Sequence, residues 1–154
     1  MGEKEFKVYV MMGIPGSGKS TYATTHLSEL PIISRDIIRI ELGFCKPNEK
    51  YKGTRDEERL VTEYENALIK TYCLKKQSFI VDDMNIGRWR PSLIDKLKGH
   101  NAYIVFVKMD TPLEVCAERR KGQIDANTLE KMYDSIIEPS KDEYDEMIIA
   151  TGTE

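Results

Sequence analysis

One segment near the start of the chain combines glycines, a lysine and a serine at a spacing suited to holding phosphate. The run Gly13-Ile14-Pro15-Gly16-Ser17-Gly18-Lys19-Ser20 matches G-x-x-x-x-G-K-[ST] in full. Glycine lacks a Cβ and tolerates positive φ, so the backbone amides of such a loop can wrap closely around phosphate oxygens. The pattern predicts binding of a nucleoside triphosphate, with Lys19 on the β- and γ-phosphates and Ser20 ligating Mg²⁺. A tight turn that requires glycine is the weaker alternative, because such a turn does not explain the lysine and serine at this spacing.

A second segment pairs a carboxylate with an arginine. In Ser34-Arg35-Asp36-Ile37-Ile38-Arg39, the side chains of Asp36 and Arg39 are three residues apart and would share one face of a helix. The carboxylate could accept the proton of an attacking hydroxyl, and the arginine could bind a phosphate of the acceptor. Helix capping by Ser34 or Asp36, with Arg39 as a solvated partner, explains the same residues equally well.

Two acidic residues follow the third expected strand, in the run Asp82-Asp83-Met84-Asn85. They could support a metal ion or orient Arg39, whereas Asp and Asn are also common in turns at strand ends. We favour the functional interpretation, because a phosphate-binding loop needs an acidic strand end close by.

Two further basic segments each allow two interpretations. Arg88-Trp89-Arg90 could stack a base and hold a phosphate, but we favour an indole packed on the surface at the start of a helix. Arg119-Arg120-Lys121, before Gly122, could form a lid that closes over the γ-phosphate and excludes water. The alternative for this second segment is a solvated, charged helix end, but we favour the lid.

Alternating strands and helices are expected to position these residues. Apolar runs predict strands, and apolar residues at helical spacing predict helices. Thr54 and Thr111 open apparent capping boxes, and Asn127 is expected to cap a later helix. The order indicates an α/β fold with a parallel sheet of about five strands sandwiched between helices, in a single domain over residues 1–154. Strands are expected at 6–12, 31–34, 78–82, 102–109 and 147–150, and helices at 19–29, 36–42, after 54, at 89–98, after 111 and after 127.

Composition narrows the class of protein. The net charge of −3 over 154 residues argues against a general nucleic-acid coat, so any contact with a polyanion must be local. Cys45, Cys73 and Cys116 are too few and too scattered for a disulfide framework or a metal site, which favours a reducing, cytoplasmic setting. The apolar run at 8–12 is too short to cross a membrane, so no membrane partner is expected. A homo-oligomer is left open.

At these motifs the sequence resembles the kinase domain of the bacteriophage 5′-hydroxyl polynucleotide kinases. The resemblance covers nearly the whole chain and rests on the residues from Gly13 to Thr21, the R-D-x-x-R segment and Val81-Asp82-Asp83-Met84-Asn85. The resemblance continues in the same order along the chain with the basic segment at 119–121 and with Lys131-Met132-Tyr133. The resemblance implies a P-loop kinase fold with a basic lid, and transfer of the γ-phosphate of ATP to the 5′-OH end of DNA or RNA with Mg²⁺.

The resemblance also implies roles for single residues. Asp36 would be the general base, Arg39 would hold the acceptor's phosphate, and Asp83, with Asn85 from the same motif, would belong to the acceptor site. Arg119, with either Arg120 or Lys121, would bind the γ-phosphate, although the lid is shorter than in that family and its Arg-x-x-x-Arg spacing is not kept. The phosphatase domain of that family does not fit in 154 residues, so no 3′-phosphatase activity is expected.

We therefore expect a polynucleotide kinase in which Lys19, Asp36, Arg39 and Arg119 are catalytic. Two other kinds of protein fit the same scaffold. One is a small-molecule kinase acting on a nucleoside, a sugar or a metabolite. The other is a nucleotide-gated binding module that hydrolyses ATP slowly and transfers no phosphate.

Overall fold

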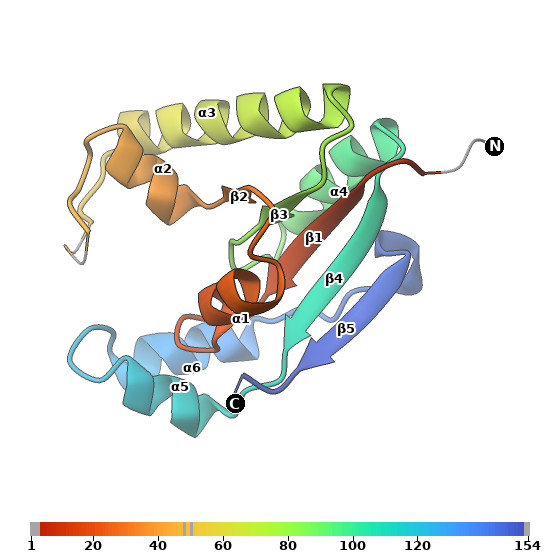
Figure 1. The fold of residues 1–154 in the computed structure, drawn as a ribbon. Helices are drawn as coiled ribbons and strands as arrows, with labels where there is room; N and C mark the ends of the chain where they lie inside the picture. Colours follow the sequence, from red (N-terminus) through yellow and green to blue (C-terminus); the bar gives the residue numbers. More distant parts are fainter. Residues whose placement is uncertain (1–3, 48, 50, 153–154) are drawn as a thin grey trace.

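Five parallel strands form one sheet in the computed structural model, which describes residues 4–47, 49 and 51–152 (Figure 1). Every neighbouring pair of strands is parallel, and the spatial order is β2-β3-β1-β4-β5. This confirms the predicted sheet. The strands are β1 (Lys7–Met12), β2 (Ile32–Ile33), β3 (Phe79–Val81), β4 (Tyr103–Met109) and β5 (Glu146–Ala150).

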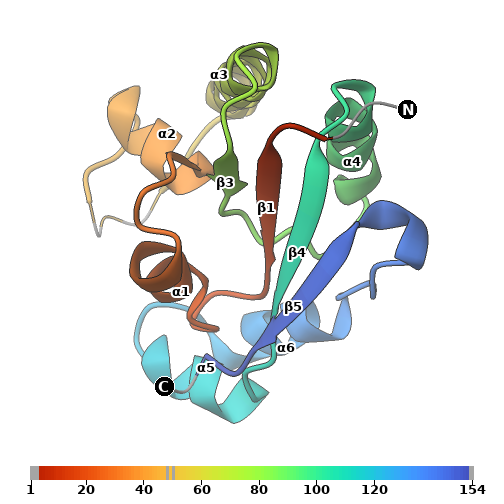
Figure 2. The same ribbon diagram turned by 45° about the vertical axis from the view of Figure 1, so that its right-hand side comes forward.

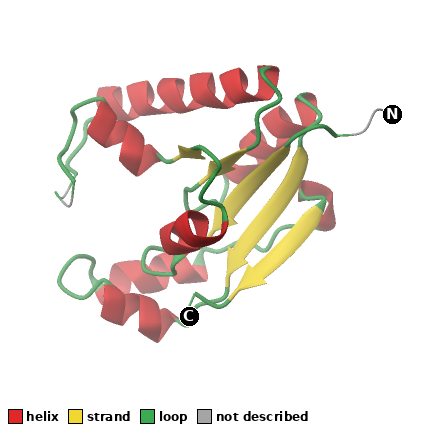
Figure 3. Cartoon of the chain, viewed as in Figure 1, coloured by secondary structure: helices red, strands yellow, loops and turns green. Residues whose placement is uncertain are grey.

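Helices cover both faces of the sheet (Figures 2 and 3). On one face, buried side chains such as Val10 of β1 pack with Val61, Leu97 and Leu129 from three different helices. On the other face, Ala23 packs with a smaller cluster that includes Met11. Each such buried aliphatic side chain contributes about 1.5–3 kcal/mol to folding. The helices are α1 (Lys19–His26), α2 (Arg35–Glu41), α3 (Arg55–Leu74), α4 (Arg90–Gly99), α5 (Leu113–Arg119), α6 (Ala126–Asp134) and the 3₁₀ helix η1 (Lys141–Glu143).

The strand order places a crevice beyond the end of β1. Because β1 lies between β3 and β4, the chain leaves β1 toward one edge of the sheet and later returns to build the other edge. Ligands of open parallel sheets bind at such a switch point, outside the carboxyl ends of the strands. Residues 13–20 follow β1, residues 34–36 follow β2, and residues 82–85 follow β3, so the predicted site segments meet there.

Three local predictions were wrong. Thr111 does not cap α5; its hydroxyl instead donates to the carbonyls of Ser17 and Thr151, which ties the end of β4 to the glycine-rich loop. Asn127 does not cap α6, which begins at Ala126 after Asp125 and has no side-chain cap. Helix α1 ends at His26 rather than at residue 29, where Leu27 leaves the helical region with φ −127°. The capping box of Thr54 and Glu57 is present as predicted.

The helices in the described part of the chain do not combine the length and apolar character that crossing a bilayer requires. Cys45, Cys73 and Cys116 are all free thiols.

Candidate active site

The loop between β1 and α1 has the backbone conformation of an anion-binding loop. Gly16 and Gly18 adopt φ of 84° and 94°, which other residues rarely do. A Cβ on Gly16 would also lie 2.8 Å from the carbonyl oxygen of Cys116 in α5. The amide of Gly13 donates to the carbonyl of Met84 at 3.0 Å, so the loop is fixed to the segment after β3. The loop thus presents its amides at the start of α1, where the helix adds unsatisfied N–H donors.

Lys19 stands in the middle of a cluster of charges. Its ammonium nitrogen lies 3.5 Å from the carbonyl oxygen of Ile14. Burial lowers the pKa of Lys19, and the charge of Arg120 adds to this shift. The charges of Asp82, Asp36 and Asp83 oppose it. Lys19 is therefore within electrostatic reach of the carboxylates that follow β2 and β3, as the sheet order requires.

Ser20 and Asp82 form a pair beside the loop. The hydroxyl of Ser20 donates to Oδ2 of Asp82 at 2.8 Å. The other carboxylate oxygen of Asp82, Oδ1, is buried and has no hydrogen-bond partner among the described residues. Burial raises the pKa of Asp82, and the hydrogen bond from Ser20 opposes that shift. A hydroxyl and a carboxylate with an unused buried oxygen are ligands of the type that Mg²⁺ prefers.

Asp36 and Arg39 share one face of α2, as predicted. Their side chains form an ion pair in which Nη1 of Arg39 lies 2.8 Å from Oδ1 of Asp36. Ser34 caps this helix, since its Oγ accepts from the amide of Ile37, so capping and the Asp36–Arg39 pair coexist. The side chain of Asp36 is 87% exposed and thus accessible to an acceptor, whereas that of Arg39 is only 18% exposed.

Glu58 of α3 is a site residue that the sequence analysis missed. Its two carboxylate oxygens accept from Nε and Nη2 of Arg39, at 3.1 and 2.7 Å. The hydroxyl of Tyr51 donates to the same carboxylate, and the Tyr51 ring lies under the guanidinium of Arg39. Hydrogen bonds from Arg39 lower the pKa of Glu58, against the effect of its partial burial. The local sequence gave no signal, because Glu58 meets Arg39 only through the packing of α3 on α2.

Asp83 contacts Arg35 rather than Arg39. Its Oδ1 accepts from the backbone amide of Arg35 at 2.9 Å, which links the end of β3 to the start of α2. Glu65 of α3 lies against Asp83, and its carboxyl is within 3.7 Å of Nη1 of Arg35. Burial, together with a hydrogen bond to Asp83 and the charge of Asp83, raises the pKa of Glu65 to about 9. The raised pKa favours the protonated form of Glu65, which can donate to Asp83.

The side-chain amide of Asn85 donates hydrogen bonds to backbone carbonyls and is not bonded to Asp36 or Arg39. Its Nδ2 donates to the carbonyls of Met11, Val81 and Asp83, at 2.6, 3.4 and 3.2 Å. Asn85 itself adopts φ of 51°, in the left-handed region that Asn tolerates. These contacts fix the ends of β1 and β3 beside the loop. A direct contact of Asn85 with an acceptor stays a prediction.

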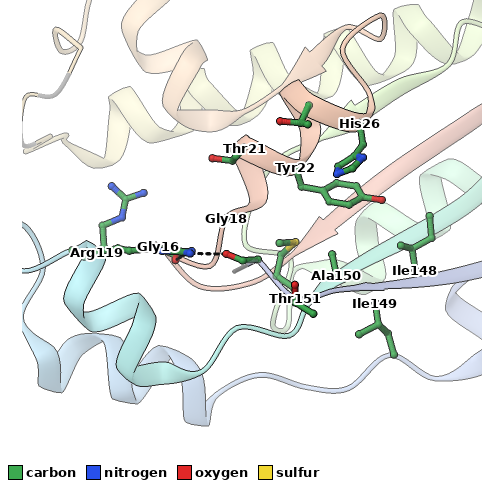
Figure 4. A pocket seen from close by; sticks show the side chains of 14 residues that line it. Gly16, Gly18, Thr21, Tyr22, His26, Arg119, Ile148, Ile149, Ala150 and Thr151 are labelled. Atoms are coloured by element: carbon green, nitrogen blue, oxygen red, sulfur yellow. Dashed lines mark hydrogen bonds between the residues drawn. The ribbon is translucent and has the colours of Figure 1, made fainter. Parts of the chain in front are cut away.

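The basic residues at the end of α5 lie in two different environments. Arg119 donates from Nη1 to the carbonyl of Gly16 at 2.9 Å and from Nη2 to that of Gly152 at 2.6 Å, so it fastens α5 to the loop (Figure 4). Arg120 donates to Gln123 and keeps a buried Nε without a partner among the described residues. Because the charge of Arg120 lowers the pKa of Lys19, Arg120 is close to where a phosphate would lie.

Two cavities lie near the candidate site, and the first of them is lined in part by the glycine-rich loop. The first cavity, of about 630 Å³, lies between α1, the end of α5 and the end of β5 (Figure 4). His26 stacks on Tyr22 there, with ring centroids 4.4 Å apart. The second cavity, of about 870 Å³, lies between α3 and the segment that joins β3 to α4. The lining of the first cavity includes Gly18, Thr21, Tyr22, His26, Arg119 and Ile149, and that of the second includes Arg35, Glu58, Asp83, Arg88, Trp89 and Lys96.

In the segment Arg88–Arg90, the sequence analysis favoured an indole packed on the surface at the start of a helix, and the structure differs from that prediction. Trp89 is 77% exposed, so its indole is not packed on the surface of α4. Arg90 is the buried member of the segment, at 4% exposure. Its guanidinium donates to the carbonyls of Asn85 and Ile137 and forms an ion pair with Glu143 at 2.9 Å.

A parallel sheet of this strand order, with a phosphate-binding loop after its central strand, defines the P-loop class of nucleotide-binding folds. Within that class the chain belongs to the family described as an AAA domain, which matches residues 8–146.

Similar proteins include polynucleotide kinases. The chain is 26% identical over 152 residues to a protein of Autographa californica nuclear polyhedrosis virus to which bifunctional polynucleotide kinase/RNA ligase activity is ascribed. The match covers 90% of this chain but only 22% of the viral protein. A chain of the Pnkp1/Rnl/Hen1 RNA repair complex is 19% identical, with a TM-score of 0.73 over 87% of this chain and 45% of that one.

Sugar kinases share the fold as well. A sugar kinase from Janibacter is 18% identical, with a TM-score of 0.66 over 97% of this chain and 87% of that one. Identities this low show the fold alone. The comparisons confirm the predicted P-loop kinase fold and the similarity to polynucleotide kinases, and they do not distinguish among acceptors.

Proposed function

We propose that this domain transfers the γ-phosphate of ATP to the 5′-OH end of a DNA or RNA strand. The observation that carries the proposal is the Asp36–Arg39 pair at the end of β2, beside Lys19. An exposed carboxylate 2.8 Å from a guanidinium, within electrostatic reach of the phosphate-binding loop, suits an acceptor that has both a hydroxyl and a phosphate. A polynucleotide end provides both groups, and the name of the viral relative supports this acceptor.

The donor would lie across the loop. Its phosphates would accept hydrogen bonds from the amides of residues 13–20 and from Lys19, with Arg120 close by. The first cavity is continuous with the loop and would take the nucleoside, between Tyr22 and His26 on one side and Ile149 on the other. Arg119 would hold α5 against Gly16. To contact the γ-phosphate as predicted, its guanidinium would have to give up the hydrogen bond to the carbonyl of Gly16 and donate to a phosphate oxygen instead.

Ser20 and Asp82 would hold Mg²⁺. The unpartnered Oδ1 of Asp82 and the adjacent hydroxyl of Ser20 would provide two protein ligands for such an ion. Oxygens of the triphosphate would provide further ligands. When bound, the ion neutralises charge on the β- and γ-phosphates.

The transfer step follows from this arrangement. The 5′-oxygen attacks the γ-phosphorus in line, the bond from that phosphorus to the bridging oxygen breaks, and ADP leaves. Asp36 accepts the proton of the hydroxyl as the new P–O bond forms. Lys19 and the loop amides stabilise the charge that spreads over the transferred group.

Arg39 would position the acceptor. Arginine has five N–H donors, and Glu58 and Asp36 use three of those of Arg39. Two donors remain for the acceptor's phosphate, while Glu58 keeps the guanidinium oriented. The negative net charge of the chain fits this local recognition of a strand end better than binding along a duplex.

A comparison of acceptors tests the proposal. The protein is incubated with γ-labelled ATP and Mg²⁺, with either a single-stranded oligonucleotide bearing a 5′-OH or the matching nucleoside. We expect label on the oligonucleotide and little on the nucleoside, because the nucleoside lacks the phosphate that Arg39 would bind. Equal labelling of the two, or labelling of the nucleoside alone, would contradict a polynucleotide acceptor.

A small-molecule acceptor is the second candidate. The fold shared with a sugar kinase and a second cavity of about 870 Å³ favour it, since that volume would hold a sugar or a nucleoside. Adding sugars as acceptors in the same assay separates the two candidates.

A further inference from the structure

We propose that Trp89 is a stacking platform for one nucleobase near the 5′ end of the acceptor strand, at the mouth of the second cavity. This inference rests on the proposed function and assigns a second contact to the same substrate. It concerns a residue on the segment between β3 and α4, away from the Asp36–Arg39 pair.

The exposure of Trp89 is the first observation. Its indole is 77% exposed, more than any other large apolar side chain among the described residues. A tryptophan side chain buries roughly 150–250 Å² when it is covered, so leaving it in water forgoes a large stabilisation. An aromatic side chain held in this way at a cavity mouth is suited to a planar ligand. Nucleobases stack on such side chains with little regard to sequence.

The backbone on both sides of Trp89 is fixed. The next residue, Arg90, is buried and joins this segment to the carbonyls of Asn85 and Ile137 and to the carboxylate of Glu143. Helix α4 begins at Arg90, directly after Trp89. Asn85 is itself bonded to the ends of β1 and β3. The segment that carries the indole is therefore tied to β3 and to β1, the strand that precedes the glycine-rich loop, so little of its backbone must be ordered when a base binds.

The charges around the platform suit a nucleic acid. The guanidinium of Arg88 lies over the Trp89 ring, 5.2 Å from its centroid, and has no ion-pair partner among the described residues. Lys96, also at this cavity, donates to Oδ1 of the neutral side chain of Asn66 at 2.8 Å. The acids of the cavity already have partners: Glu58 pairs with Arg39, Asp83 accepts from the amide of Arg35, and Glu65 lies 3.7 Å from the guanidinium of Arg35. Arg88 and Lys96 thus remain available for backbone phosphates next to a stacked base.

The cavity connects this platform to the acceptor site. Trp89, Arg35, Glu58 and Asp83 all line the second cavity, and Glu58 is the residue that holds Arg39. A strand whose end reaches Asp36 can therefore extend along the cavity toward Trp89. The sequence contains a single tryptophan, so its fluorescence reports on this position alone.

Fluorescence and abasic acceptors test the platform. Oligonucleotides with a 5′-OH are titrated onto the wild-type protein in the presence of a non-hydrolysable ATP analogue, with a normal strand or with one abasic site at position 1, 2 or 3. We expect the normal strand to quench Trp89, and the abasic site at one of these positions to abolish the quenching. In transfer assays, Trp89→Ala should raise the KM for the normal strand about 10-fold, and Trp89→Phe should raise it less.

The double comparison identifies stacking specifically. Trp89→Ala and the critical abasic site should not add, because each removes the same contact. Tyr64→Ala, which removes a partly exposed ring on α3 that lines neither cavity, serves as the control and should leave KM unchanged. Trp89→Ala should also leave the affinity for ATP unchanged.

The outcomes separate this inference from the proposed function. Labelling of the oligonucleotide without quenching, or with equal KM values for wild type and Trp89→Ala, would overturn the platform and leave the kinase proposal intact. Base-dependent quenching without any labelling would support the platform and contradict the proposed transfer. Neither quenching nor labelling would overturn both.

Discussion

The guanidinium of Arg39 on α2 is held by the carboxylate of Glu58 on α3 through two hydrogen bonds, at 3.1 and 2.7 Å. Asp36 takes a third donor of the same guanidinium at 2.8 Å. The proposed general base and the proposed phosphate clamp are thus joined, and a residue from a different helix orients them. Any acceptor that binds Arg39 must share it with Glu58.

Removing the charge of Glu58 tests this orientation. In Glu58→Gln the amide keeps one hydrogen bond to Arg39 but loses the charge-assisted pair, which is worth about 1.5–3 kcal/mol when a charged group is involved. We expect the KM for the acceptor to rise about 10-fold while the KM for ATP stays near the wild-type value. Steady-state kinetics with each substrate varied in turn measures the two effects.

Asp56→Asn is the matched control for that variant. It removes an exposed carboxylate two residues earlier on α3, whose ion pair with Arg59 lies on the surface. Kinetics should be unchanged in this control. An acceptor KM that stays constant in Glu58→Gln would show that Arg39 needs no orientation from α3.

The buried pair of Arg90 and Glu143 predicts a stability effect. Glu143→Gln leaves the guanidinium of Arg90 buried without its counter-charge, which costs about 3 kcal/mol. Asp142→Asn changes an exposed neighbour and should stay within about 0.5 kcal/mol of wild type. Urea unfolding followed by circular dichroism measures both free energies. Equal midpoints for Glu143→Gln and wild type would mean that the ion pair contributes little to the fold.

The raised pKa of Glu65 should make the stability of the fold depend on pH. Its pKa is about 9 in the folded chain and 4.5 ordinarily, so the folded state binds a proton that the unfolded state has released. The contribution is fully present below about pH 4.5 and is lost as the pH rises toward 9. One proton sets a limit of about 1.4 kcal/mol per pH unit.

Thermal unfolding between pH 5 and 9 checks this prediction. Stability should fall with rising pH in the wild type and fall less in Glu65→Gln, whose amide can still donate to Asp83. Glu63→Gln, an exposed neighbour on α3, should keep the wild-type slope. If Glu65→Gln and wild type show the same slope, Glu65 does not bind the proton in this range.

Replacing Lys19 should weaken the binding of the phosphate donor. Lys19→Ala removes the ammonium at the phosphate-binding loop, and we expect calorimetry with Mg·ATP to show an affinity about 100-fold weaker or no measurable heat. Lys70→Ala, an exposed lysine on α3, should bind as the wild type does. Unchanged heats in the Lys19 variant would remove the basis for placing the triphosphate on residues 13–20.

The sequence predicted best the features that depend on local pattern. The glycine-rich loop is contiguous, and its context of a buried strand and a following helix can be read from apolar runs. The pairing of Asp36 with Arg39 follows from helix geometry alone, since the two residues are one turn apart. The meeting of the segments after β1, β2 and β3 follows from the rule for parallel sheets.

Contacts between distant segments could not be predicted in this way. Glu58 reaches Arg39 only because α3 packs on α2, and the two residues are 19 positions apart in the sequence. Thr111 has the sequence context of a helix cap, but the carbonyl of Ser17 lies nearby in space and accepts the hydrogen bond from its hydroxyl. Arg90 and Trp89 are adjacent, yet Arg90 is buried and Trp89 is exposed, and the counter-charge that allows Arg90 to be buried comes from Glu143, 53 residues later in the chain.

The most direct test of the central claim is transfer from labelled ATP to a 5′-OH oligonucleotide by wild type and by Asp36→Asn, with ATP affinity measured on the same preparations. The account predicts that the substitution lowers the transfer rate at least about 100-fold, because the hydroxyl loses its base, while ATP affinity changes less than about threefold. Transfer by Asp36→Asn at close to the wild-type rate, or no labelling of the oligonucleotide by the wild type, would contradict it.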